Sequence, residues 1–275
     1  WKFISLAYIP PTIAGIVLAY RGRLLAGGIL TAFFIALQIM SNHVQMSYYF
    51  LFVILFIAGA YFEDAWRNKT LPGFFKASAV LLVAALIGVA ANLSNLYHTY
   101  TYSKETMRGK SELVQTGNAA KQTSSGLDRD YITNWSYGIG ETWTLLVPNF
   151  KGGSSAAPLS QSETAMEKAN PMYGSLYNSF PQYFGSQPWT AGPVYVGAFV
   201  LFLFVLGCFI VKGPLKWALL GATFFSIVLA WGKNFMPLTD FFIDYIPMYN
   251  KFRAVSSILV IACLLYTSDA ADDLL

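Results

Sequence analysis

Long apolar segments alternate with short polar ones along this chain, at the spacing that a membrane bilayer requires. No Asp, Glu, Lys or Arg occurs from residue 24 to residue 62. A helix needs about 20 apolar residues to cross the hydrocarbon core, so this run is long enough for two spans. Its only polar cluster is Ser41-Asn42-His43. We therefore predict a helical hairpin of two spans, 24–40 and 44–62, with a tight turn at that cluster.

The same pattern predicts four further complete spans and one truncated span. The complete ones are 3–20, 74–93, 194–211 and 215–231. The first contains Pro10-Pro11; because proline lacks a backbone donor and clashes with the preceding turn, we expect this helix to be kinked or broken. A seventh span begins near Ala254. The predicted fold is an all-α polytopic membrane protein with about six complete transmembrane helices and a truncated seventh.

The apolar pattern ends abruptly after Ala262. Asp269, Asp272 and Asp273 fall where the seventh span needs apolar residues, and each charge at the bilayer centre would cost about 2.5–3.5 kcal/mol. The string CLLYTSDAAD, which begins at Cys263, resembles the translation of a transposon-end sequencing adaptor. We therefore interpret residues 263–275 as a non-native tail and expect the chain to be a fragment of a longer protein.

Composition supports a membrane protein and excludes several other classes. The 275 residues are 55% hydrophobic and only 12% charged, whereas soluble domains are roughly 25% charged. These values exclude a typical soluble enzyme and a disordered chain, and without clustered basic charge they exclude nucleic acid as a partner. Cys208 and Cys263 are too few for a disulfide framework or a zinc site.

The charged residues predict the orientation of the spans. If every span crosses, three loops with an excess of basic residues fall on one side, and the positive-inside rule makes that side cytoplasmic. These basic residues are Arg21, Arg23, Arg67, Lys69, Lys76, Lys212 and Lys216. The predicted organisation is four spans in 1–96, an extracytoplasmic domain or loop in 97–193, and three spans in 194–262 with an external loop at 232–253.

The extracytoplasmic segment is too long to be a simple connection. It is electrically neutral, rich in Gly, Ser, Asn and Pro, and carries aromatic residues at intervals. A short surface helix is expected at 103–115. Trp135, Tyr137, Glu141 and Trp143 lie close together in the sequence. Their aromatic rings suit stacking on a sugar, and they suit the core of an external domain as well.

Two polar clusters at the external membrane face are candidates for binding. His43 and Gln45 follow the hairpin turn, and Gln45 shares a helix face with Tyr49. They form either a pocket for a sugar or phosphate, or only a polar turn. Lys251 and Arg253 precede the seventh span on the side that the positive-inside rule disfavours, so they either bind an anionic head group or anchor the helix at the interface.

Acidic pairs are weaker candidates. Asp240 and Asp244 lie one turn apart on an amphipathic segment, 235–249, and would hold a divalent ion, share acid–base work or form a solvated face. Asp128 and Asp130 have the Asp-x-Asp spacing of many metal-dependent sugar transferases. The sequence contains no nucleophile triad, phosphate-binding glycine loop or metal-binding histidine pair. No metal ligand is assigned, and a divalent metal is the only candidate cofactor.

Three motifs resemble those of one family. They are Lys2-Phe-Ile-Ser-Leu-Ala-Tyr-Ile-Pro-Pro11, Asn42-His-Val-Gln-Met-Ser-Tyr-Tyr49 and Pro247-Met-Tyr-Asn-Lys-Phe-Arg253. In order and membrane placement they look like segments of the YfhO-like bacterial membrane proteins, in particular the large forms from Bacteroides-type bacteria. The resemblance covers residues 1–262. The family is assigned to the GT-C-like glycosyltransferases, which implies a location in the bacterial cytoplasmic (inner) membrane.

The resemblance also implies an activity, the transfer of sugar from a polyprenyl-phosphate carrier to a cell-envelope glycan acceptor. The family's catalytic acid usually lies in the first external loop, which this chain is expected to lack, so no catalytic residue is assigned. On this interpretation the donor and its phosphate are bound by His43, Gln45, Lys251 and Arg253. The acceptor is bound by Trp135, Tyr137, Glu141 and Trp143. Membrane lipid is the remaining expected partner.

Two other classes of function stay open. A transporter or lipid flippase also uses broken helices such as the one at Pro10-Pro11, but it is expected to place polar residues near the bilayer midplane. The predicted spans are almost purely apolar there. A non-enzymatic assembly protein would use 97–193 only as a docking surface.

Overall fold

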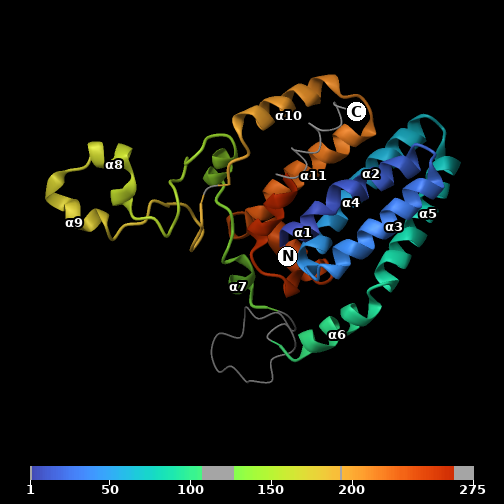
Figure 1. The fold of residues 1–275 in the computed structure, drawn as a ribbon, viewed down its shortest axis with the longest axis horizontal. Coiled ribbons are helices and arrows are strands. Elements are labelled where there is room, and N and C mark those ends of the chain that lie inside the picture. Colours follow the sequence, from blue (N-terminus) through green and yellow to red (C-terminus); the bar gives the residue numbers. More distant parts are fainter. Residues whose placement is uncertain (1, 107–126, 193, 263–275) are drawn as a thin grey trace.

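The computed structural model describes residues 2–106, 127–192 and 194–262, and in these ranges the fold is helical (Figure 1). No β-strand forms there, and the extended contact that does occur is an isolated antiparallel bridge between Pro158 and Pro181. The all-α prediction is therefore confirmed for the described residues. The predicted non-native tail, 263–275, lies outside them.

Within the described ranges, three helical stretches are long and apolar enough to cross a membrane. They are Phe3–Tyr20, which joins α1 (Lys2–Ala7) to α2 (Ile9–Tyr20), α4 (Val44–Arg67) and α5 (Leu71–Ala90). A fourth candidate is the pair α11 (Pro214–Ala230) and α12 (Met236–Tyr245), which includes a bend of 103°. The described residues thus support the membrane prediction in its coarser form, with three or four helical stretches that could span a bilayer.

Two of the predicted spans form shorter apolar helices. α3 covers Leu24–Met40, the predicted bounds, whereas α10 covers only Ala198–Ile210 of the predicted 194–211. With 13 residues, α10 is about 20 Å long, less than the roughly 30 Å hydrocarbon core. Residues 194–197 stay outside the helix, and Gly197 has a left-handed φ of 100° at its start. The predicted six complete transmembrane helices are therefore not confirmed.

The expected break at the proline pair is present. α1 ends at Ala7 and α2 begins at Ile9, with Pro10 and Pro11 in its first turn. Proline is tolerated there because the first-turn N–H groups have no partner within the helix. The Thr12 hydroxyl donates to the Tyr8 carbonyl over 2.6 Å, so this break leaves that carbonyl satisfied.

The hairpin turn is also where the sequence predicts it. α3 ends at Met40 and α4 begins at Val44, with Asn42 in the left-handed region that asparagine tolerates.

Where α2 packs against α3, small residues let the two helices approach closely. A Cβ on Gly27 would lie 2.5 Å from the Ala19 nitrogen and 2.6 Å from the Gly15 oxygen, so only glycine fits.

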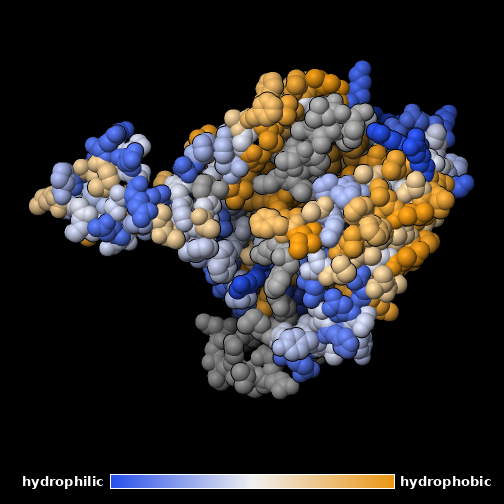
Figure 2. All heavy atoms as spheres, in the orientation of Figure 1, coloured by the Kyte–Doolittle hydropathy of each residue, from blue (hydrophilic) through white to orange (hydrophobic). Residues whose placement is uncertain are grey.

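The basic loops gather at one end of the bundle, called the basic end here (residues 21–23, 63–69 and 212–217). Tyr20 stacks on Tyr61 with ring centroids 4.6 Å apart and on Phe74 at 5.4 Å, which brings the loops after α2 and α4 together. Figure 2 shows hydrophilic surface at this end, beside apolar flanks over α10, α3 and α5. Large exposed apolar side chains on the flanks are typical of surfaces that face lipid.

The opposite end, called the hairpin end (residues 41–43, 127–137 and 231–256), holds the hairpin turn and α12. Three phenylalanines form the core beneath it: Phe52 of α4, Phe225 of α11 and Phe242 of α12, with centroids 5.5–5.8 Å apart. The predicted amphipathic helix in 235–249 is confirmed as α12. Because α11 and α12 meet at 103°, α12 runs across the bundle end rather than along it.

The long segment that the sequence places outside divides into distinct parts. α6 (Leu93–Lys104) continues beyond α5. Most of the predicted surface helix 103–115 lies outside the described residues. α7 (Arg129–Thr133) and η2 (Gly140–Leu145) lie against the hairpin end. α8 (Glu163–Glu167) and α9 (Gly174–Tyr177) form a lobe that projects away from the bundle (Figure 1).

Candidate functional site

Two motifs that are far apart in the sequence meet at the hairpin end. The Gln45 side-chain amide at the start of α4 donates to the Arg253 carbonyl over 2.7 Å and to the Tyr49 hydroxyl over 3.1 Å. The Tyr48 hydroxyl donates to the Pro247 carbonyl over 3.0 Å. The predicted donor cluster around Gln45 and the predicted phosphate cluster around Arg253 therefore form a single region.

The Arg253 side chain lies against two aromatic residues of segment 127–137. Its Nη1 donates to the Tyr131 hydroxyl over 2.7 Å, and its Cζ lies 5.6 Å and 5.5 Å from the ring centroids of Tyr131 and Trp135. The residue is exposed. None of the described carboxylates forms an ion pair with it, so its positive charge is not neutralised by the described residues.

The backbone that carries Arg253 has an unusual conformation. Met248 and Ala254 have φ angles of 67° and 60°, a region that costs a residue other than glycine roughly 1–2 kcal/mol. Surrounding contacts maintain it, because the Leu127 N–H donates to the Asn250 carbonyl over 2.9 Å and the Tyr249 side chain is buried. Such outliers often occur at functional sites.

Segment 127–137 lies along 230–256 through several backbone contacts. The Tyr137 N–H donates to the Ala230 carbonyl over 2.8 Å, and the Ser256 N–H donates to the Trp135 carbonyl over 3.2 Å. These bonds fix segment 127–137 to the end of α11 and to the residues that follow Arg253. Tyr131 and Trp135 are thereby held at the hairpin end.

The acidic pair on α12 is engaged by an arginine. Arg129 of α7 donates to Asp240, and its Nη2 donates to Asp244 over 2.6 Å. The hydrogen bond that Arg129 donates to Asp244 is the main cause that raises the pKa of Arg129. These contacts favour a structural role over the divalent-ion role considered for the pair.

The Asp-x-Asp segment also has a local structural role. The Asp128 carboxylate accepts from the Asp130 N–H over 2.8 Å and caps α7. Across the part of the chain that the structure describes, no group of three His, Cys, Asp or Glu residues is arranged to hold a metal ion.

The two remaining predicted donor residues lie close to the site. His43 is the N-cap of α4, and its Nδ1 accepts from the Met46 N–H over a long 3.4 Å. Lys251 lies in the 3-10 turn η6 (Tyr249–Lys251) beside Arg253 and is half-buried. The Gln45 side-chain amide donates to Tyr49 and Arg253 and not to His43 or Lys251.

The four predicted acceptor residues do not form one surface. Trp135 lies beside Arg253, whereas Tyr137 and Glu141 are buried and Trp143 is 55% exposed. Glu141 accepts from the Gly138 N–H and from the Tyr183 hydroxyl. Burial, reinforced by the bond to Glu141, raises the pKa of Tyr183.

The cleft beside Glu141 has a volume of about 10 Å³, roughly the space of one water molecule. A Cβ on Gly185 would collide with the Glu141 carboxylate and the Tyr183 hydroxyl, so this cluster is tightly closed. In this conformation it has no room for a sugar.

Tyr131 is the contact that sequence reasoning did not assign. Its spacing of four residues from Trp135 places both rings on one side of α7 and the turn that follows. That spacing can be recognised in the sequence. The contact with Arg253 cannot, because Arg253 lies 122 residues away.

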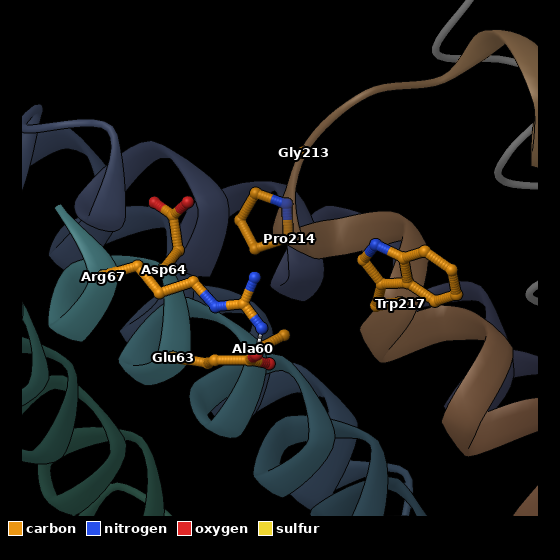
Figure 3. Close-up of a pocket in the computed structure, with 7 residues that line it drawn as sticks. All are labelled: Ala60, Glu63, Asp64, Arg67, Gly213, Pro214 and Trp217. Carbon is orange, nitrogen blue, oxygen red and sulfur yellow. Dashed lines mark hydrogen bonds and ion pairs between the residues drawn. The ribbon is translucent and has the colours of Figure 1, made fainter.

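A cavity among the described residues lies at the basic end (Figure 3). It has a volume of about 480 Å³ between α4 and α11. Arg67 points into it and pairs with Glu63, and Trp217 borders the far side. Asp64 adds a second carboxylate to the lining, and the exposed side chains indicate an open depression between helix ends.

Comparison of this chain with protein-family models, with curated proteins and with solved structures finds no match.

Proposed function

We propose that this chain belongs to an integral membrane glycosyltransferase-like protein that transfers sugar from a polyprenyl-phosphate-linked donor to a cell-envelope acceptor. The proposed location is the bacterial cytoplasmic membrane, with 97–193 on the extracytoplasmic face. The observation that carries the proposal is Arg253, an exposed guanidinium without a carboxylate partner among the described residues, joined to the hairpin motif through Gln45.

The chemistry of the donor fits this region. A polyprenyl phosphate keeps its chain in the lipid and its phosphate at the interface, so its binding site must lie at the ends of spanning helices. Gln45 lies in the first turn of the candidate span α4 and donates to the Arg253 carbonyl. A guanidinium binds phosphate through two parallel N–H groups, which makes arginine well suited to this role.

A lipid flippase is a second candidate because of one observation, the 103° bend between α11 and α12. Interrupted helices are frequent in transporters, where their ends contact the substrate. Arg253 then serves as a passing contact for a lipid phosphate rather than as part of a transferase site. A non-enzymatic assembly protein is the third class, with the α8–α9 lobe as its docking surface.

The test is sugar transfer by the full-length protein in proteoliposomes that contain polyprenyl-phosphate sugars labelled in the sugar. We expect transfer to a cell-envelope glycan fraction, and loss of transfer in Arg253→Ala. Movement of a fluorescent polyprenyl phosphate between leaflets without any transfer would favour the flippase. Absence of both activities in correctly inserted protein would contradict both functions.

A further inference from the structure

α7 and the turn that follows it present two aromatic rings to the same guanidinium. Tyr131 and Trp135 lie four residues apart, and both ring centroids are within 5.6 Å of the Arg253 Cζ. The Tyr131 hydroxyl also accepts a hydrogen bond from Nη1 over 2.7 Å. Arg253 is therefore held by one hydrogen bond and two cation–π contacts.

These rings are fixed in place by their own surroundings. Asp128 caps α7, Arg129 ties it to Asp240 and Asp244 on α12, and Ile132 is completely buried beneath it. The Trp135 carbonyl accepts from the Ser256 N–H, three residues after Arg253. The position of Tyr131 relative to Arg253 is thus set by packing as well as by the bond between them.

Aromatic contacts differ from a carboxylate contact in their effect on charge. A carboxylate at this position would neutralise Arg253 and occupy two of its donors. The Tyr131 hydroxyl takes one of the five guanidinium N–H groups, and neither ring carries a formal charge. The remaining donors and the whole positive charge stay available to an anion.

We propose that Tyr131 is a positioning residue that, with Trp135, orients Arg253 toward the phosphate of a lipid-linked ligand. The inference rests on the proposed function for the identity of that ligand. It also changes the expected role of Trp135, which belongs with the donor phosphate rather than with the acceptor. Tyr131 itself acts through Arg253 and does not touch the ligand.

The experiment is a double-mutant cycle on ligand affinity. Full-length protein in nanodiscs is titrated with polyprenyl phosphate, and inorganic phosphate is tested as a competitor. The variants are Tyr131→Leu, Arg253→Ala and the double variant, with Tyr131→Phe as the conservative change. Tyr173→Leu, an exposed tyrosine on the projecting lobe, is the matched control. Thermal unfolding of each variant reports whether the fold is intact.

We expect Tyr131→Leu to weaken polyprenyl-phosphate binding about tenfold. Tyr131→Phe keeps the ring and should weaken it about threefold. The double variant should bind no more weakly than Arg253→Ala, because Tyr131 has nothing left to orient. If Tyr131 had only a structural role, Tyr131→Leu would lower the unfolding temperature. The double variant would then lose the product of the two single losses of affinity.

Two results would overturn the inference. One is unchanged affinity in Tyr131→Leu while Arg253→Ala loses binding. The other is a double variant that loses the product of the two single effects. If the unmodified protein binds no polyprenyl phosphate, the proposed function fails, and this inference fails with it. Competition by inorganic phosphate at equal concentration would support the orientation of Arg253 by Tyr131 and Trp135 toward a phosphate. It would contradict a lipid-linked ligand.

Discussion

The two ends of the helix bundle both present an arginine next to aromatic side chains, but they compensate its charge differently. At the basic end, Arg67 pairs with Glu63 one turn earlier on α4, and the two side chains are 76% and 61% exposed. At the hairpin end, Arg253 is held by Tyr131 and Trp135. There the described residues supply it with no carboxylate.

This difference indicates where an anion would bind. An exposed pair four residues apart on a helix stabilises it by only about 0.3–0.5 kcal/mol, and it leaves no net charge at the basic end from these two residues. Cavity volume points the other way, because the depression beside Arg67 measures about 480 Å³. The charge of the lining is the better guide here, because two carboxylates, Glu63 and Asp64, stand against the one guanidinium of Arg67 in this cavity and offer an anion no attraction.

The largest effect is expected from removing the two arginines in turn. Arg253→Ala should reduce sugar transfer at least tenfold, because a hydrogen bond to a charged group is worth roughly 1.5–3 kcal/mol. Arg67→Ala should change it less than twofold. Transfer rates in proteoliposomes measure both, and labelling of external loops checks that insertion is normal. Equal losses in the two variants would remove the distinction between the ends.

The next effect compares one glutamate from each end. Glu141 is 3% exposed and accepts from Tyr183 and Gly138, whereas Glu63 is largely exposed. Glu141→Gln should lower the free energy of unfolding by about 1–3 kcal/mol, because a buried acceptor is replaced by a group that includes a donor. Glu63→Gln should stay within about 0.5 kcal/mol. Thermal unfolding in detergent measures both losses of stability. Equal losses in the two variants would contradict the burial of Glu141.

Local features of the fold were predictable from the sequence. The hairpin turn at Asn42 and the break before Pro10 depend on residues within one turn of helix, so the polar cluster and the proline pair are sufficient to locate them. The length of α10 was not predictable in this way. Its sequence is apolar from 194 to 211, but the helix starts only after Gly197, whose left-handed φ the hydrophobic pattern does not register.

The candidate site was predictable only in part. Gln45 and Arg253 were identified because each is polar at a membrane face, but their contact spans 208 residues and nothing in either motif specifies it. Asp240 and Asp244 show the reverse case. Their spacing suggested an ion site, yet Arg129, which pairs with both, comes from a segment more than 100 residues earlier. Long-range pairing decides such roles.

A smaller effect is expected from the link between α7 and α12. Arg129→Ala removes both ion pairs and should cost about 1 kcal/mol, since Asp240 and Asp244 are 40% and 43% exposed and regain water. Affinity for polyprenyl phosphate should fall only a few-fold, because Tyr131 keeps its packed neighbours. Unfolding and binding titrations measure the two effects. A loss of binding as large as that of Arg253→Ala would show that Arg129 itself binds the ligand.

The smallest effect concerns the helix caps that begin α4 and α5. His43 caps α4 through a long bond of 3.4 Å, whereas Thr70 makes no side-chain bond at the start of α5. His43→Ala should therefore lower stability by about 0.5 kcal/mol, with Thr70→Ala close to zero. Because the cap occupies Nδ1, we expect transfer to change less than twofold in His43→Ala, and His43→Asn to restore the stability. A tenfold loss of transfer that His43→Asn does not restore would instead place His43 in contact with the donor, and the hairpin turn would then supply a second ligand group beside Arg253.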